Sequence, residues 1–329
     1  MENIKDVEEL NQLKKDFNEE ISKVIIGQNQ IINQIFIALL CNGHILLEGV
    51  PGLGKTLLIN SVAKAFDLNF SRIQFTPDLM PSDITGTEII QENKTSGKRE
   101  FNFYQGPIFG NIILADEINR TPPKTQAALL QAMQEHKITI GNKTYDLEKP
   151  FLVFATQNPI EQEGTYPLPE AQLDRFMFNL IIDYPTSDEE TLIVKNINNI
   201  INANIKPIIN KTQLHKFQEL IVHMPVSDHV IDYAVNFVRE TRINKDTSDT
   251  IRKWLNWGAG PRASSILIMA AKAHALLNNK TTPEISDVQY VIKPVLRHRI
   301  IPNFNAESEG LTRDDILDYL LKHVNHVAI

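Results

Sequence analysis

The chain contains one glycine-rich stretch whose surroundings permit a single local fold. An apolar run at 45–47 precedes it and predicts a buried strand, and residues 57–66 follow it with apolar side chains at helical spacing. A glycine-rich loop between a strand and a helix is the context that the phosphate-binding motif G-x-x-x-x-G-K-[ST] requires. The stretch that matches this motif reads Gly49-Val50-Pro51-Gly52-Leu53-Gly54-Lys55-Thr56.

The residue types in this loop suit ATP with Mg²⁺. Glycines let the backbone turn tightly and present its N–H groups to phosphate oxygens, and the start of the following helix adds a partial positive charge. We expect Lys55 to reach the β- and γ-phosphates and the Thr56 hydroxyl to hold Mg²⁺. The residues predicted to bind the nucleotide at this loop are Gly49, Pro51, Gly52, Leu53, Gly54, Lys55, Thr56 and Leu57.

Two carboxylates follow a second apolar run. Residues 112–115 predict a buried central strand that ends at Asp116 and Glu117. Because ligands of open α/β sheets bind beyond the carboxyl ends of the strands, both carboxylates should lie near the phosphates. We expect Asp116 to orient Mg²⁺ through its water shell and Glu117 to polarise the attacking water.

Three further residues are candidates with two interpretations each. Asn158 follows a predicted strand at 151–156, where its amide would contact a γ-phosphate or position water; an Asn before a proline also simply starts a turn. Ile25 and Ile26 precede the first sheet strand, and they suit stacking on a base and packing in the core equally well. The sequence leaves these alternatives open.

The strand and helix patterns divide the chain after residue 185. Before that point, residues 70–75 and 177–182 predict further strands, and 87–104 and 137–147 predict two hairpins. We therefore expect an α/β nucleotide-binding domain with N-terminal helices over 1–185 and an all-α domain over 186–329. The helices predicted in the second domain are 187–200, 211–222, 227–243, 247–256, 261–278, 284–297 and 312–324.

Two arginines are candidates for contacts with the nucleotide. Arg262 follows Pro261 in the first turn of a predicted helix, where it is either a phosphate ligand or a solvated helix end. Arg175 ends a short predicted helix after the Asn158 strand and should lie at the edge of its domain, away from its own phosphate loop. Its alternative is a pairing with Asp174 or Glu170.

Together these residues resemble the MoxR family of AAA+ ATPases over almost the whole chain. Relatives often carry Ser where this chain has Gly260, a departure that retains the proline and the arginine. The two hairpins resemble the helix-2 insert and the pre-sensor-1 hairpin of the clade that includes magnesium-chelatase motor subunits. The matching motifs are Walker A at 49–56, Walker B at 112–117, sensor 1 at 155–159, the arginine-finger region at 168–176 and sensor 2 at 260–263.

The resemblance implies an AAA+ P-loop domain with a parallel-sheet core, an all-α lid, and ATP hydrolysis in a homo-hexameric ring. Each ATP would lie between two subunits, with Arg175 acting from the neighbour. Chaperone-like remodelling or maturation of partner protein complexes is implied too, including metal insertion and partners with a von Willebrand factor A domain. A low-turnover ATP-dependent binding scaffold and a magnesium-chelatase-like motor subunit are the alternatives. The residues implied to act from the ATP-binding subunit are Lys55, Thr56, Asp116, Glu117, Asn158 and Arg262.

Composition and motifs argue against several other classes of nucleotide-binding protein. The net charge of −7 argues against a nucleic-acid motor, and the lack of an N-K-x-D motif argues against a GTPase. An arginine in the lid, Arg262, and one that acts from a neighbour, Arg175, imply a ring, which argues against a small-molecule kinase. The single cysteine, Cys41, excludes an intrachain disulfide. Because no apolar run approaches the ~18 residues of a membrane span and the N-terminus lacks an apolar signal core, we expect a cytoplasmic protein that does not bind membranes.

Overall fold

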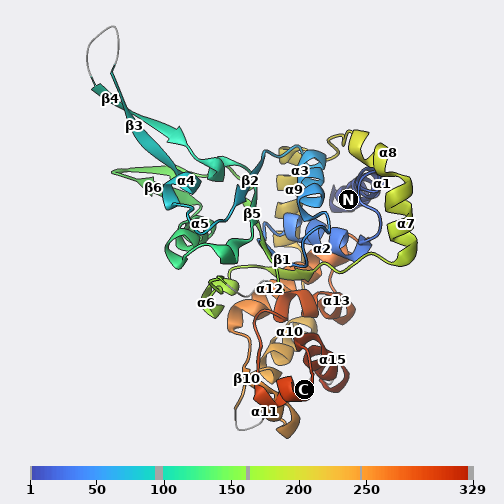
Figure 1. Cartoon of the computed structure of the whole chain (residues 1–329). Coiled ribbons are helices and arrows are strands. Elements are labelled where there is room, and N and C mark those ends of the chain that lie inside the picture. Colours follow the sequence, from blue (N-terminus) through green and yellow to red (C-terminus); the bar gives the residue numbers. More distant parts are fainter. Residues whose placement is uncertain (1, 93–98, 161–163, 245–246, 325–329) are drawn as a thin grey trace.

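A five-stranded parallel β-sheet forms the centre of the first half of the chain (Figure 1). In this computed structural model, residues 2–92, 99–160, 164–244 and 247–324 are described. The strands are β1 (Ile45–Glu48), β2 (Phe70–Gln74), β5 (Ile112–Asp116), β8 (Leu152–Gln157) and β9 (Phe178–Ile181). They lie in the order β2-β5-β8-β1-β9. The sequence predicts all five to within one residue at each end.

Side chains of the strands alternate between two hydrophobic clusters, one on each face of the sheet. Ile45 and Leu47 belong to the larger cluster and Leu46 to the smaller one, and β5 and β8 alternate in the same way. Because both faces are covered, the strands carry continuous apolar runs. Helices α1 (Glu2–Ile21), α2 (Asn29–Leu40) and α3 (Lys55–Ala65) cover one face, and α4 (Pro81–Thr85) and α5 (Pro123–Glu135) cover the other.

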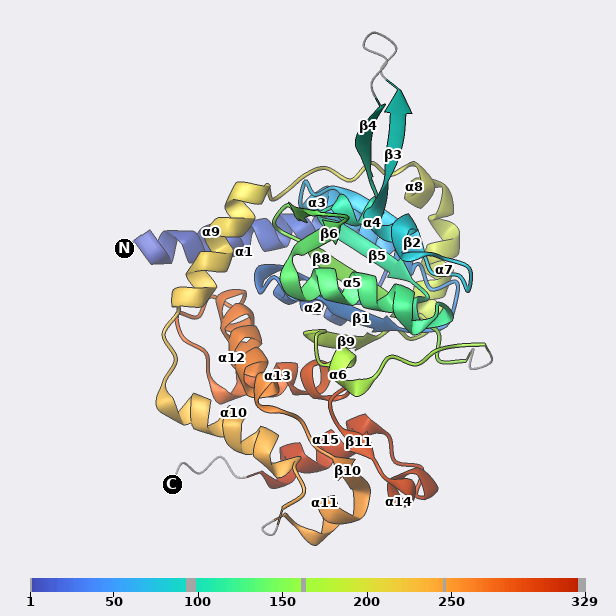
Figure 2. The same ribbon diagram turned by 90° about the vertical axis from the view of Figure 1, so that its left-hand side faces the viewer.

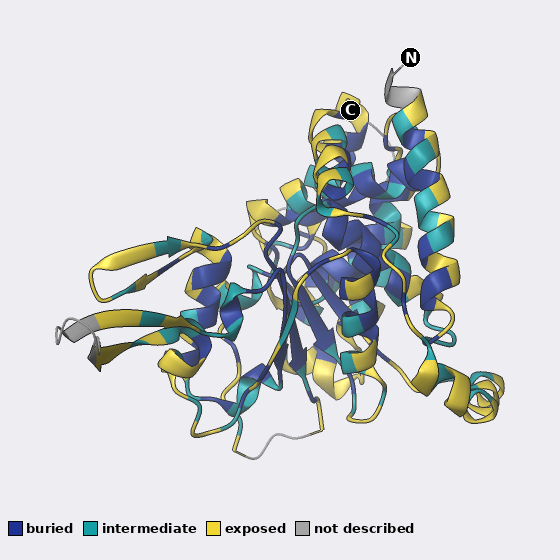
Figure 3. Cartoon of the chain, turned by 90° about the horizontal axis from the view of Figure 1, so that it is seen from above, coloured by how far each residue is buried: buried dark blue, intermediate teal, exposed yellow. Residues whose placement is uncertain are grey.

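Two β-hairpins project from the α4–α5 side of the sheet (Figures 1 and 2). The first pairs β3 (Gly86–Glu92) with β4 (Arg99–Gln105), and the second pairs β6 (Lys137–Ile140) with β7 (Lys143–Asp146). The rings of Phe103 and Tyr145 stack at 4.4 Å and join the two hairpins. Most of the predicted turn of the first hairpin, 93–98, lies outside the described residues. Figure 3 shows that both hairpins are largely exposed, whereas the sheet is buried.

Helices make up most of the second half of the chain. Two short antiparallel strands, β10 (Leu255–Trp257) and β11 (Ile301–Pro302), also occur there, and the sequence does not predict them because both are too short to show a strand period. The helices are α6 (Glu170–Leu173), α7 (Ser187–Lys195), α8 (Ile197–Asn202), α9 (Lys211–His223), α10 (Asp228–Glu240), α11 (Asp249–Trp254), α12 (Pro261–Leu276), α13 (Ile285–Leu296), α14 (Phe304–Ser308) and α15 (Arg313–His323).

The predicted boundary after residue 185 falls between β9 and α7. The larger hydrophobic cluster continues across it, because Phe217 of α9 and Leu267 of α12 belong to the same cluster as Phe36 of α2. Two separate domains therefore stay a prediction. Within the described residues, no helix combines the length and the apolar character that crossing a bilayer needs.

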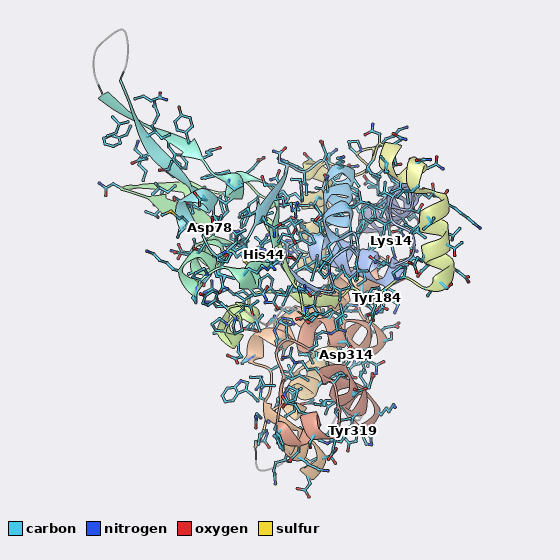
Figure 4. The ribbon with its side chains drawn as sticks, in the orientation of Figure 1. Lys14, His44, Asp78, Tyr184, Asp314 and Tyr319 are labelled. Carbon is cyan, nitrogen blue, oxygen red and sulfur yellow. The ribbon has the colours of Figure 1, made fainter. Side chains whose placement is uncertain are left out.

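His44 ties the start of β1 to its neighbours from a buried position near the hairpins (labelled in Figure 4). Its Nδ1 accepts the Val153 N–H at 3.0 Å, and its Nε2 lies 3.3 Å from the Met133 carbonyl oxygen of α5. A carbonyl only accepts, so the proton sits on Nε2 and the ring is neutral. Burial accordingly lowers the pKa of His44 to about 4.

Acid should weaken folding through His44. An unfolded histidine has a pKa of about 6.5, so below that pH the unfolded chain binds a proton at His44. The folded chain does not bind this proton until the pH nears the pKa of about 4 that His44 has in the folded state. Above the pKa of the unfolded state, proton binding at His44 takes nothing from the stability of the folded chain. Between about pH 7.5 and pH 5 the free energy of unfolding should fall by about 2 kcal/mol. Denaturant titrations of the wild type and His44→Gln check this. Equal pH slopes for the two proteins would contradict it.

Candidate nucleotide-binding site

The phosphate-motif loop joins the carboxyl end of β1 to the amino end of α3. Gly52 and Gly54 have φ angles of 87° and 72°, a left-handed backbone that favours glycine. A Cβ at either position would meet open space, whereas one at Gly49 would lie 2.7 Å from the Ile182 carbonyl oxygen. The residue before α3 is Gly54, which has no side chain to accept hydrogen bonds from the first N–H groups of the helix. These N–H groups therefore suit an anion.

Lys55 folds back over this loop. Its ammonium group donates to the carbonyls of Gly49 and Val50, the latter at 3.2 Å. Burial lowers the pKa of Lys55, while the charges of Asp116 and Glu117 act in the opposite direction. The lysine and the two carboxylates are therefore electrostatically coupled within one site.

Thr156, at the end of β8, holds both carboxylate residues. Its hydroxyl donates to Asp116 Oδ1 at 2.6 Å and accepts the Glu117 N–H at 2.8 Å. Glu117 adopts a left-handed backbone with a φ of 56° where β5 ends, a conformation that is uncommon for residues other than glycine, asparagine and aspartate. The strand order brings this end of β5 within one strand of the phosphate loop, since β8 pairs with both β5 and β1.

Neighbouring side chains hold the outer oxygens of the two carboxylates. Arg72 of β2 donates to Asp116 Oδ2 through Nη2 at 2.7 Å and Nε at 3.1 Å. Gln74 Nε2 donates to Glu117 Oε2 at 3.0 Å, and Arg120 Nη1 lies 3.0 Å from the same oxygen. No motif singles out these three partners. For Arg72 and Gln74 the available signal is the polar alternation of strand 70–75, which faces the carboxylates only once β2 pairs with β5, and for Arg120 it is the spacing of three residues from Glu117.

Asn158 and the two isoleucines keep features of both of their interpretations. Asn158 is buried just beyond the end of β8, yet its Oδ1 accepts the Ile160 N–H at 3.1 Å, as a turn-starting Asn does. Ile25 is half-buried and packs against the larger hydrophobic cluster. Ile26 is half-buried and lines a depression beside α7 and α8.

The groups at this edge of the sheet fit a nucleoside triphosphate and Mg²⁺. The loop is open at its positive-φ glycines, and the hydroxyl of Thr56 and the carboxylate of Asp116 are hard oxygen ligands, the kind Mg²⁺ prefers. Leu53 packs against the larger cluster beneath the loop. Pro51 and Leu57 are exposed beside it, where they offer apolar surface.

Arg175 lies at the opposite edge of the sheet from the phosphate loop. The Met177 N–H donates to the His44 carbonyl at 2.7 Å, so Arg175 precedes β9 where His44 precedes β1. Both strands run in parallel from there toward the loop, and β1 alone is about 13 Å long at the usual rise of a parallel strand. The Arg175 guanidinium donates to the Leu130 carbonyl of α5, and it lies away from its own loop as the sequence predicts.

Arg262 lies at this same edge in the structure, whereas from the sequence we expect it to reach the phosphates of its own subunit. Its Nη1 donates to Asp174 Oδ2 at 3.2 Å. The first turns of α12 pack there, because Ser265 and Met269 line one depression with Gly43 and Arg175 at the amino ends of the strands. The position of α12 therefore places Arg262 beside Arg175 and leaves the phosphate loop on the far side of the sheet.

Comparisons with known families agree with this architecture. A family model for the ATPase family associated with various cellular activities (AAA) matches residues 44–178. A second model, for an AAA lid domain, matches residues 251–320. We use the term lid region below for residues 251–320.

Curated relatives match most of the chain. Chaperone MoxR1 of Mycobacterium tuberculosis is 41% identical over 306 residues, which span 93% of this chain and 80% of the relative. The uncharacterized protein YeaC of Bacillus subtilis is 42% identical, and the match spans 96% of both chains. Protein MoxR of Paracoccus denitrificans is 28% identical over 90% of this chain and 91% of its own.

A solved structure shares the fold over nearly its full length. It is the crystal structure of a protein from Cytophaga hutchinsonii assigned as an ATPase. The match has a TM-score of 0.89 and a sequence identity of 42%, and it covers 98% of this chain and 97% of that one.

Proposed function

Because this chain belongs to the MoxR family of AAA ATPases and so hydrolyses ATP as a chaperone of that family, we propose that it acts as a hexameric ring with each ATP between two subunits. One observation carries the proposal. The phosphate loop and the two carboxylates lie at the carboxyl edge of the sheet, whereas Arg175 and Arg262 lie at the opposite edge. A single chain does not complete its own site, but a neighbour in the same orientation supplies the missing arginines.

Each residue at the carboxyl edge is proposed to have one role. The loop N–H groups and Lys55 bind the β- and γ-phosphates. Thr56 and Asp116 hold Mg²⁺, which when bound neutralises phosphate charge. Glu117 accepts a proton from the attacking water, and Asn158 orients that water.

The two arginines are proposed to act on the ATP of the neighbouring subunit. A guanidinium that reaches a γ-phosphate from another chain stabilises the charge of the phosphoryl-transfer transition state. Arg262 is 57% exposed in its side chain and Arg175 is half-buried, so both are placed at a surface that a neighbour can cover. Because both arginines lie at the same edge of the sheet, their position supports action of both on the neighbour's ATP. It gives less support to the arrangement in which Arg262 acts on the ATP of its own subunit and Arg175 on that of the neighbour.

The work of the ring is proposed to be the remodelling or maturation of partner protein complexes in the cytoplasm. The name of the 41%-identical relative, a chaperone, supports remodelling. The partner classes that the sequence resemblance implies, metal-containing complexes and proteins with a von Willebrand factor A domain, are part of this proposal. The exposed hairpins, with Ile90 and Phe101 at 56% and 64% exposure, offer apolar surface to such a client.

Assembly is the direct test of the ring. Wild-type protein with ATP and Mg²⁺ should sediment as a hexamer, and Lys55→Ala should need a higher ATP concentration to do so. A protein that stays monomeric at every nucleotide and protein concentration, while still hydrolysing ATP, would overturn the proposal. Client binding is tested separately, through proteins that co-purify with a hydrolysis-deficient Glu117→Gln variant only when ATP is present.

Lys55→Ala should bind ATP about 10-fold to 100-fold more weakly, since one charge-assisted hydrogen-bonding group contributes about 1.5–3 kcal/mol. Calorimetric titration with ATP measures the dissociation constant. Lys64→Ala is the matched control, because Lys64 lies in the last turn of the same helix, far from the loop. An unchanged dissociation constant for Lys55→Ala would contradict the assignment of the loop.

A further inference from the structure

We propose that Arg299, a buried arginine of the lid region, is the positioning residue for Arg175 and Arg262, an inference that rests on the proposed roles of those two arginines. Arg299 follows α13, and its side chain lies against the segment 174–177, which contains Arg175. Its side chain is only 1% exposed. It lies apart from the phosphate loop and would act on the reaction through Arg175 and Arg262 alone.

The backbone on both sides of Arg175 is held by this one guanidinium. Nη2 of Arg299 donates to the carbonyls of Asp174 at 3.1 Å and Phe176 at 2.6 Å, and Nη1 donates to the carbonyl of Met177 at 3.3 Å. His298 adds a bond from Nε2 to the Phe176 carbonyl at 3.0 Å. The direction in which Arg175 leaves the backbone is thereby set by the lid region.

The same guanidinium orients Arg262 through a shared carboxylate. Asp174 Oδ1 accepts from Arg299 Nε at 2.7 Å, and Asp174 Oδ2 accepts from Arg262 Nη1 at 3.2 Å. Without a fixed acceptor, the largely exposed Arg262 side chain would sample many rotamers. One carboxylate between two guanidinium groups also leaves an excess positive charge beside Arg175, which favours an anion such as a phosphate.

Lysine cannot replace this arrangement. The guanidinium carries five N–H groups in a planar fork, and Arg299 makes five bonds: to the Asp174 carboxylate, to three carbonyls of segment 174–177, and to the Val295 carbonyl. A lysine offers three donors on one nitrogen and would release part of the segment. Burial lowers the pKa of Arg299 to about 10, which still leaves it charged near neutral pH.

Arg299→Lys tests the inference by steady-state kinetics. We expect kcat to fall about 10-fold to 100-fold, the size of loss that a misplacement of about 1 Å in a reacting group produces. KM for ATP should stay within about threefold, because the ground-state contacts at the phosphate loop are untouched. A kcat equal to the wild-type value would overturn the inference.

Arg297→Lys is the matched control. Arg297 lies two residues away and pairs with Asp314 through Nε at 3.0 Å and Nη2 at 2.8 Å. It donates to the Asn179 carbonyl, and within the described residues it makes no hydrogen bond to segment 174–177. A comparable loss of thermal stability in both variants, with kcat lost only in Arg299→Lys, supports positioning. Equal losses of kcat would reduce Arg299 to a structural role.

A double-variant comparison separates this inference from the proposed function. In an Arg175→Ala/Arg262→Ala background, Arg299→Lys should change single-turnover hydrolysis by less than about twofold, since residues that act through one another are not additive. A full additional loss would overturn the inference. If Arg175→Ala and Arg262→Ala themselves leave turnover unchanged, the proposed function fails first.

Asp174→Asn decides the matter if Arg299→Lys does not fold. This change leaves the backbone bonds of Arg299 in place and removes the charge that both arginines share. It should lower kcat with little change in KM, and Asp174→Glu should restore part of the loss. Wild-type kcat in Asp174→Asn would overturn the shared-carboxylate step.

Discussion

Replacing Glu117 by Gln should leave ATP binding intact and reduce turnover by on the order of 10²-fold or more, the lower part of the range for general acid–base groups. The amide keeps the size of the side chain, and it retains an oxygen for the Gln74 and Arg120 donors, which lie 3.0 Å from one carboxylate oxygen. It removes the negative charge that accepts a proton from water. Binding and chemistry should therefore separate in this variant.

Calorimetry gives the ATP affinity of Glu117→Gln, and phosphate release gives its turnover. Glu135→Gln serves as the matched control, because Glu135 is an exposed carboxylate at the end of α5 that accepts a hydrogen bond from Gln131 of the same helix. Near-normal turnover in Glu117→Gln would mean that another residue activates the water, with Asp116 as a proton acceptor and Asn158 as a group that orients the water as the next candidates.

Arg175→Ala should bind ATP and hydrolyse it about 10³-fold more slowly, the contribution that an arginine supplied by a neighbouring chain makes to phosphoryl transfer. The change also removes the bond from Arg175 to the Leu130 carbonyl, so the thermal midpoint must be measured alongside. A folded, assembled Arg175→Ala protein with wild-type turnover would exclude the arginine from the reaction.

Mixing identifies the subunit on which Arg175 acts. Arg175→Ala and Lys55→Ala subunits should each hydrolyse little ATP alone. In a mixed ring, a Lys55→Ala subunit lends its intact arginines to the ATP on an Arg175→Ala neighbour, and one complete site forms. Activity should return in proportion to such neighbours, with differently tagged subunits proving that mixed rings exist. Mixed rings without activity would remove the main support for the neighbour's role.

Motifs that are continuous in sequence could be interpreted before the structure. The phosphate loop, the Asp116–Glu117 pair and the hairpins depend on residues within about twenty positions of one another, and local period and turn chemistry dictate such units. The placement of Arg262 could not be predicted in this way. It depends on where α12 packs, and that is set by contacts between segments more than two hundred residues apart, such as Cys41 with Met269.

The same limit applies to the partners of the site residues. Thr156 and Arg72 contact Asp116 from neighbouring strands, so their roles follow from strand order and register. Arg299 carries no sequence signal either, because a basic residue after a helix is usually solvated. Only the fold reveals that it is buried against segment 174–177.

Because the strands of the sheet are parallel, the molecule has two unlike ends. Arg175 and Arg262 lie at the amino ends of the strands, and the nucleotide site lies at the carboxyl ends. Contacts between such unlike surfaces join subunits head to tail, and a series of this kind either closes on itself or continues as a helical filament. In an unclosed series of any length, the subunit at one end would have a nucleotide that no neighbour's arginines reach, and the subunit at the other end would have arginines that face no neighbour's nucleotide. If Arg175 and Arg262 act on the neighbour's ATP as proposed, only a closed ring makes all sites equivalent, and the catalytic capacity of each chain then depends on the geometry of the whole assembly.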